Sequence, residues 1–168
     1  MTKERVLLMA DMLINLYELD LKIKDDIEGI VIKRVLAPDR RKVIKFVKDN
    51  FNDNFVDECK ASLNNNPITC YIAEKDKEII GFISFEATAK DFVGPMGIKK
   101  SERGKGIGKL LMFHCLYSMK EMGYAYAIIG SSSERNIPFH QHISNAQIIQ
   151  SKTKGIYTRM IGDYGREK

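Results

Sequence analysis

One stretch in the middle of the chain decides the fold, and it reads Phe92-Val93-Gly94-Pro95-Met96-Gly97-Ile98-Lys99-Lys100-Ser101-Glu102-Arg103-Gly104-Lys105-Gly106-Ile107-Gly108. An apolar strand comes first, then a loop rich in glycine and cations, and then a helical pattern from about 107 to 122 that Gly123 ends. Glycines let backbone N–H groups approach a ligand closely, and the start of a helix attracts phosphate oxygens. This strand, loop and helix therefore predict a cradle for a small phosphorylated ligand.

The basic charge of the chain is concentrated on this loop. The whole chain carries 27 Lys and Arg against 22 Asp and Glu, a net charge of +5. Within eleven residues, five cations less one acid supply +4 of it, namely Lys99, Lys100, Arg103, Lys105, Lys109 and Glu102. Proteins that bind nucleic acid usually spread Lys and Arg over a whole face and interleave aromatic residues, so we expect no nucleic-acid partner.

Length and composition are those of an ordinary globular chain. With 168 residues, 44% of them apolar and 29% charged, the sequence predicts one domain, 1–168, around a single core. No apolar run approaches the roughly 20 residues that cross a bilayer, and the N-terminus lacks the pattern of a signal peptide, so we expect a cytoplasmic protein without a membrane partner. Cys59, Cys70 and Cys115 are scattered and odd in number, which favours reduced core thiols over a zinc or disulfide framework.

The other elements follow from hydrophobic periodicity and turn signals. Strands are expected over 30–35, 69–74, 78–86, 124–129 and parts of 147–161. Helices are expected from Pro38 onward, over 51–63 and over 136–145, with a polar loop at 130–133. This order predicts an α/β or α+β domain with a mixed sheet.

Residues 1–28 form an expected N-terminal helical extension. Between residues 3 and 22 large apolar side chains recur at helical spacing, which predicts an amphipathic helix with a stripe of Val6, Leu7, Leu13, Ile14, Tyr17 and Leu21. Such a stripe packs on something, and three roles stay open for it: covering the sheet, shaping a pocket or forming a homodimer.

The loop fits neither of two common nucleotide motifs, because it lacks a Gly-Lys-Ser/Thr ending and Lys109 replaces the last glycine of the dinucleotide pattern. Instead, Arg103-x-x-Gly106-x-Gly108 resembles the acyl-CoA pyrophosphate motif, Gln/Arg-x-x-Gly-x-Gly/Ala, of the GCN5-related N-acetyltransferase (GNAT) family. The flanking elements are similar to that family over residues 30–161. The resemblance implies a mixed, mostly antiparallel central sheet flanked by helices, acetyl-CoA as co-substrate and no metal.

The same resemblance implies which residues bind acetyl-CoA. The pyrophosphate would lie on Arg103, Gly104, Lys105, Gly106, Ile107, Gly108 and Lys109. The strand before the loop would carry a bulge, which its Gly and Pro residues favour, with the backbone N–H groups of Met96 and Ile98 as oxyanion donors beside Gly97. Asn136 either contacts the cofactor or simply caps the helix that it starts.

Two residues are candidates for proton transfer. Glu86 ends an apolar strand, where a carboxylate can act as a general base directly or through water, with Glu134 and Asp91 as alternatives. His140 stands where the family commonly places a Tyr that protonates the CoA thiolate, and Tyr157 or Tyr126 are alternatives to it. His140 and His142 diverge on a helix and lack a third ligand, so we expect no metal site there.

Two segments, 87–98 and 123–130, resemble the branch of the family that holds bacterial glucosamine and glucosaminide N-acetyltransferases. This likeness implies direct transfer of acetyl to the primary amine of a small molecule, with glucosamine or a glucosaminide as the best candidate and no cysteine nucleophile. Two other readings stay open: a transferase acting on peptide or protein amines, and an acetyl-CoA-binding module without chemistry.

Overall fold

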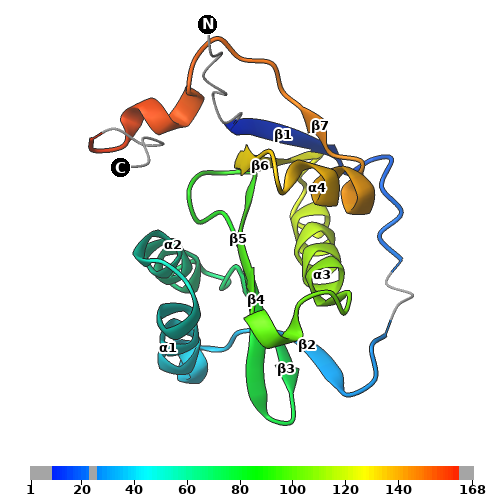
Figure 1. Ribbon diagram of the computed structural model, residues 1–168, viewed down its shortest axis with the longest axis vertical. Coiled ribbons are helices and arrows are strands. Elements are labelled where there is room, and N and C mark those ends of the chain that lie inside the picture. The colour runs from blue at the N-terminus through cyan, green and yellow to red at the C-terminus, as the bar shows by residue number, and fades with distance from the viewer. Residues whose placement is uncertain (1–8, 23–25, 163–168) are drawn as a thin grey trace, which may run out of the picture.

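The computed structural model describes residues 9–22 and 26–162, and its frame is one seven-stranded sheet in the order β2-β3-β4-β5-β6-β1-β7 (Figure 1). The strands are β1 Met9–Asn15, β2 Ile30–Arg34, β3 Cys70–Lys75, β4 Glu78–Phe85, β5 Phe92–Ile98, β6 Tyr126–Ser133 and β7 Gln147–Ile148. All neighbouring pairs are antiparallel except β5 and β6, which are parallel. The mixed, mostly antiparallel sheet is therefore confirmed.

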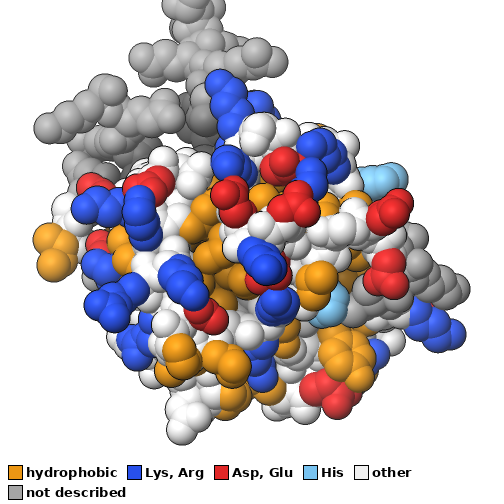
Figure 2. Space-filling model, turned by 90° about the horizontal axis from the view of Figure 1, so that it is seen from below, with side chains coloured by type: hydrophobic (Ala, Val, Ile, Leu, Met, Phe, Trp, Pro, Cys, Tyr) orange, Lys and Arg blue, Asp and Glu red, His pale blue; other side chains and the backbone are white. Residues whose placement is uncertain are grey.

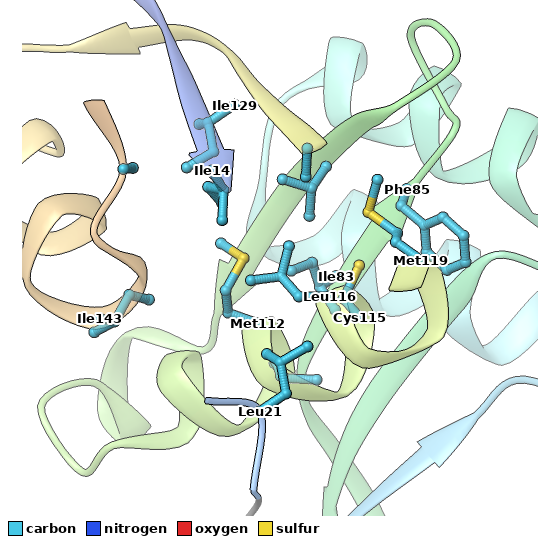
Figure 3. Packing of buried hydrophobic residues seen from close by; sticks show 14 of the residues in the cluster. Ile14, Leu21, Ile83, Phe85, Met112, Cys115, Leu116, Met119, Ile129 and Ile143 are labelled. Atoms are coloured by element: carbon cyan, nitrogen blue, oxygen red, sulfur yellow. The ribbon is translucent and has the colours of Figure 1, made fainter. Parts of the chain in front are cut away.

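Helices cover both faces of this sheet (Figure 1). They are α1 Arg40–Asn50, α2 Asp53–Leu63, α3 Ile107–Glu121 and α4 Ile137–Ser144. Short 3-10 turns lie at Ala37–Asp39 before α1, at Lys100–Glu102 before α3 and at Gly155–Arg159 after β7. Because side chains alternate along a strand, Phe82 packs among α1 and α2 while Ile83 and Phe85 pack against α3. Figure 3 shows the α3 side, where Met112, Leu116 and other α3 residues fill the space against the strands.

The predicted N-terminal helix is wrong over the described residues. Residues 9–15 form β1, which lies between β6 and β7. Burial along it has a period of two, since Met12, Ile14 and Leu16 are buried while Leu13 is half-exposed. The strand is more stable than a helix here because β6 and β7 each pair with β1 through backbone hydrogen bonds. The residues of the predicted extension at 1–8 and 23–25 lie outside the described residues.

The C-terminal third also differs from the predicted elements. The strand expected at 124–129 with a polar loop at 130–133 is one strand, β6, because the serines at its end pair with Met9 and Ala10 of β1. The strands expected over 147–161 reduce to two residues of β7 and a 3-10 turn at Gly155–Arg159. The other predicted helices and strands are confirmed to within a few residues.

Candidate functional site

The site begins where β5 and β6 part. Their parallel pairing is limited to Phe92 with Ile128 and Val93 with Ile129. Beyond this point β5 carries the predicted bulge, since Phe85 of β4 faces Val93 whereas Ile83 faces Met96. The two unpaired strand edges leave a gap that points toward the glycine loop.

The bulge aims two backbone N–H groups into this gap. Lys99 N–H donates to the Ile80 oxygen of β4 (2.8 Å), and the antiparallel register pairs Gly97 with Phe82. N–H groups of alternate residues point to the same neighbouring strand, so those of Met96 and Ile98 point away from β4, toward the gap. These are the two N–H groups expected to serve as oxyanion donors.

The glycine loop at the end of β5 has the backbone that phosphate binding needs. Gly104 and Gly106 have φ of +79° and +82°, a region that L side chains rarely adopt. Gly106 starts α3 without any side-chain cap, so the first N–H groups of this helix stay available to an anion. The Arg103 side chain is held by a bond from Nε to the Ile98 oxygen (3.1 Å).

Charge around the loop is partly paired. Lys105 Nζ lies 2.8 Å from a Glu102 oxygen, and this ion pair holds the pKa of Glu102 below its usual value. Lys109 Nζ lies over the ring of Phe113, 5.6 Å from its centre. Figure 2 shows the molecule from below the view of Figure 1, with an apolar patch surrounded by Lys and Arg side chains and several carboxylates.

Other predicted cofactor residues have different local roles. A Cβ built on Gly108 would lie 3.3 Å from the Phe139 ring and 3.6 Å from Met96 Cε, so the loop, the bulge and α4 meet at this glycine. Asn136 starts α4 but makes no side-chain cap bond, which excludes the simple cap and leaves its amide for another partner. Gly97 makes room for Phe51, whose ring atoms would lie 2.4 to 2.8 Å from an added Cβ, so packing explains this glycine.

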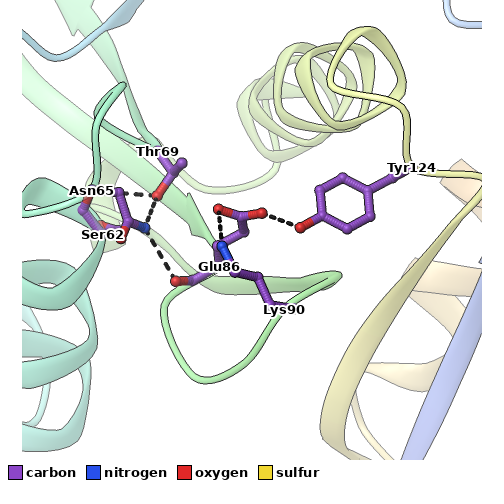
Figure 4. Close-up of polar contacts among 6 residues, drawn as sticks. All are labelled: Ser62, Asn65, Thr69, Glu86, Lys90 and Tyr124. Atoms are coloured by element: carbon purple, nitrogen blue, oxygen red, sulfur yellow. Dashed lines mark hydrogen bonds and ion pairs between the residues drawn. The ribbon is translucent and has the colours of Figure 1, made fainter.

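The side chain of Glu86 lies beside the start of β5, largely covered, and has partners of its own (Figure 4). Its side chain is 7% exposed; one oxygen accepts a hydrogen bond from the Tyr124 hydroxyl and the other lies 3.2 Å from Lys90 Nζ. Burial and the bond to Glu86 raise the pKa of Tyr124 to about 12, so Tyr124 stays protonated. The carboxylate is thus fixed in place behind Phe92, whose oxygen accepts the Glu86 N–H.

His140 lies in the interior of the molecule instead of on the helix surface. His140 is 8% exposed, and its Nδ1 atom is buried without a hydrogen-bond partner. Burial lowers the pKa of the imidazole to about 4. The ring packs edge-on against Phe139, with centres 5.2 Å apart. His140 is therefore neutral at neutral pH.

The alternative candidates are placed differently. The Tyr157 hydroxyl lies directly on β6 where the gap opens, since a Cβ on Gly130 would sit 1.9 Å from it and 2.8 Å from the Phe92 ring. Tyr126 is exposed and packs on Tyr17 (6.0 Å). Among the other carboxylates, burial raises the pKa of Asp91 at the start of β5, and Glu134 is exposed in the turn after β6.

One residue at the gap was missed by the sequence reasoning. Asp11 of β1 accepts the Ser131 N–H of β6 with Oδ1 at 2.8 Å. It fell inside the predicted N-terminal helix, and no local signal marks it, because its partner is 120 residues away in the chain.

No group of three or more His, Cys, Asp or Glu in 9–22 and 26–162 is arranged to hold a metal ion. In the same part of the chain, no helix has both the length and the apolar character needed to cross a membrane.

Comparison with solved structures identifies the fold. The chain is similar to the GCN5-related glucosamine N-acetyltransferase region of a fungal multi-domain GH3 β-N-acetylglucosaminidase, with 14% identity, TM-score 0.68, and 84% of this chain but 20% of that one covered. The chain is also similar to a GCN5-related N-acetyltransferase from Sphaerobacter thermophilus, with 17% identity and a TM-score of 0.64. That match covers 84% of this chain and 48% of the other. A third similar structure is the ribosomal-protein-alanine N-acetyltransferase from Brucella melitensis biovar Abortus 2308, with 15% identity and a TM-score of 0.56. Here 75% of this chain and 98% of the other are covered.

These likenesses show a shared fold, and the chain spans less than half the length of the first two proteins. No curated protein sequence matches the chain. The model of the acetyltransferase (GNAT) family matches residues 37–144, from the turn before α1 to the end of α4. This match covers more than half of the chain and includes the bulge, the gap and the glycine loop. The chain therefore belongs to the GNAT acetyltransferase family.

Proposed function

We propose that this protein transfers acetyl from acetyl-CoA directly to the primary amine of a small molecule, with glucosamine or a glucosaminide as the best candidate. The observation that carries the proposal is the gap between β5 and β6. It has the N–H groups of Met96 and Ile98 along one side and an uncapped helix start at its mouth.

The residues present fit acetyl-CoA. The left-handed Gly104 and Gly106 with the first turn of α3 suit a pyrophosphate, and the unpaired edge of β5 suits the amide-bearing pantetheine arm. Acetyl-CoA, when bound, supplies an activated thioester. Met96 and Ile98 would stabilise the negative charge that develops on the thioester oxygen, because their N–H groups are already oriented by the ladder to β4.

We propose two groups for proton transfer. Glu86 is the base, acting on the acceptor amine through water, since its own oxygens are held by Tyr124 and Lys90. Position favours Tyr157 over His140 as the donor to the leaving thiolate: its hydroxyl lies at the gap, whereas His140 is buried and neutral.

The small-amine acceptor has two supports. Segments 87–98 and 123–130 resemble the glucosamine and glucosaminide branch, and the fungal region described above is named for glucosamine. The name of the Brucella protein supports a second candidate acceptor, a peptide or protein amine.

The three cysteines are free and buried, which favours a reducing compartment, so we propose a cytoplasmic location.

The test is release of free CoA thiol from acetyl-CoA with glucosamine, a glucosaminide disaccharide, a polyamine and a lysine peptide. Turnover that is fastest with the two sugars is the expected result. A preference for the peptide or the polyamine would overturn the acceptor while keeping the reaction. No turnover with any amine, together with a melting temperature raised by acetyl-CoA, would favour a binding module without chemistry.

A further inference from the structure

Asp11 lies at the reaction gap although it comes from outside residues 37–144, the part that the family model matches. In the pairing of β1 with β6, Met12 faces Ile129 and Ala10 faces Ser132. Two residues of β6, Gly130 and Ser131, therefore stand opposite Asp11 alone, so β6 is bulged here. The β6 bulge begins directly after the last β5–β6 pair, at the level where β5 has its own bulge.

A side chain holds this second bulge. Ser131 has φ of +48°, and its N–H is bound by Asp11 Oδ1 at 2.8 Å in place of a strand oxygen. The opening of the gap on the β6 side thus depends on one carboxylate oxygen.

Asp11 also lies on the face from which an acceptor can reach the gap. Met12, Val93 and Ile129 point into the core under α3, so their strand neighbours Asp11 and Gly130 point to the opposite face. The α3 side is closed by the buried side chains that Figure 3 shows. The face that holds Asp11, Gly130 and the Tyr157 hydroxyl therefore offers an amine a way to the gap.

The second oxygen of Asp11, Oδ2, has no polar partner in the part of the chain that the structure describes. This oxygen would lie 3.9 Å from a Cβ added to Gly155. Gly155 and Tyr157 belong to the same 3-10 turn, so the carboxylate lies between this turn and the β6 bulge. A half-buried negative charge in such a place attracts a primary ammonium ion.

We propose that Asp11 is a specificity-determining residue of the acetyl transfer, with Oδ1 holding the β6 bulge and Oδ2 receiving the ammonium group of the acceptor. This proposal rests on the proposed function, in that the acceptor is a primary amine. It assigns the recognition of the amine to the N-terminal strand, and it separates the two oxygens by role.

The test compares Asp11→Asn, Asp11→Ala and Asp20→Asn in the full chain with the amine that the wild-type protein acetylates fastest. The Asn amide oxygen still accepts the Ser131 N–H but carries no charge. We expect Asp11→Asn to raise the KM for the amine at least 10-fold, with the KM for acetyl-CoA unchanged. Asp11→Ala should in addition lower kcat and speed hydrogen exchange at the Ser131 amide.

Asp20→Asn is the matched control, because Asp20 also accepts a backbone N–H, that of Lys22, on an exposed segment. An unchanged amine KM in Asp11→Asn would overturn the role of Oδ2, and wild-type kcat and exchange in Asp11→Ala would overturn that of Oδ1. If the wild-type protein acetylates no amine, the proposed function fails. Exchange at Ser131 then still decides the role of Oδ1, and a calorimetric comparison of amine binding decides that of Oδ2.

Discussion

His140 and Tyr157 differ in the surroundings that decide whether a side chain can give up a proton. The His140 ring is buried without a partner for Nδ1, whereas the Tyr157 hydroxyl lies at the opening of the gap. Burial disfavours the imidazolium form, which is the form that would serve as an acid near neutral pH.

Replacing Tyr157 therefore tests the proton donor. We expect Tyr157→Phe to lower kcat about 100-fold, as loss of a general acid does, with little change in the KM for acetyl-CoA. His140→Gln should lower kcat less than threefold. Steady-state kinetics with both variants check this, and the reverse order of effects would return the role to His140.

His140 also makes stability depend on pH. Its pKa falls from 6.5 in the unfolded chain to about 4 in the folded one, so between these values the unfolded state binds more protons. The contribution of neutral His140 to the free energy of unfolding is fully present above pH 6.5. It is lost as the pH falls toward 4, and the loss reaches up to about 3 kcal/mol. Melting curves from pH 7 to 4 should be less steeply pH-dependent in His140→Gln than in the wild type, whereas exposed His142→Gln should behave like the wild type.

Gly97 is a packing position, and its replacement has a second-site remedy. Gly97→Ala places a methyl group against the Phe51 ring and should cost about 1–3 kcal/mol, measured by urea unfolding. Adding Phe51→Leu should recover part of this loss relative to Phe51→Leu alone. Additive effects of the two substitutions would show that the contact is not the cause.

At the scale of elements, α3 connects the core to the glycine loop. Its N-terminus forms the end of the glycine loop, while its length packs against β3, β4 and β5 and makes one side of the core. The helix dipole and the free N–H groups thus act at a place that the core keeps rigid.

Two glycines at opposite ends of α3 separate binding from stability. Gly106 and Gly123 have φ of +82° and +96°, so alanine at either should cost about 1 kcal/mol of stability. Only Gly106→Ala should also raise the KM for acetyl-CoA, by about 10-fold, because Gly106 lies in the loop. Equal KM values for the two variants, at matched loss of stability, would contradict a cofactor role for the loop.

At the scale of the whole molecule, β1 ties the two ends of the described chain together. Leu13 pairs with Ile128 of β6 on one side and with Gln147 of β7 on the other. Successive residues of a strand point to opposite faces of the sheet, so Leu13 and Ile14 lie on different faces. The predicted helix would instead place both on the same apolar stripe.

This difference gives a test of β1. Ile14 is fully buried, so Ile14→Ala should cost about 2–5 kcal/mol, while half-exposed Leu13→Ala should cost about 1 kcal/mol or less. Urea unfolding of both variants measures the two values. Similar losses would argue for a helical stripe and against the strand.

The sequence alone determined the bulged strand, the glycine loop and α3, because their signals are local. Positive φ at Gly104 and Gly106, the Gly-Pro bulge and the helical pattern after 107 each act within a few residues of chain. The hairpin of β3 and β4 and the helices before it were predictable for the same reason.

The surroundings of the gap depend instead on contacts between distant parts of the chain. Residues 9–15 became a strand because β6 and β7 offered two rows of backbone partners, and a short apolar segment does not distinguish strand from helix by itself. The same pairing brought Asp11 to Ser131, and the C-terminal turn brought Tyr157 to Gly130. Contacts between residues far apart in the chain depend on how the whole sheet closes, which no local pattern encodes.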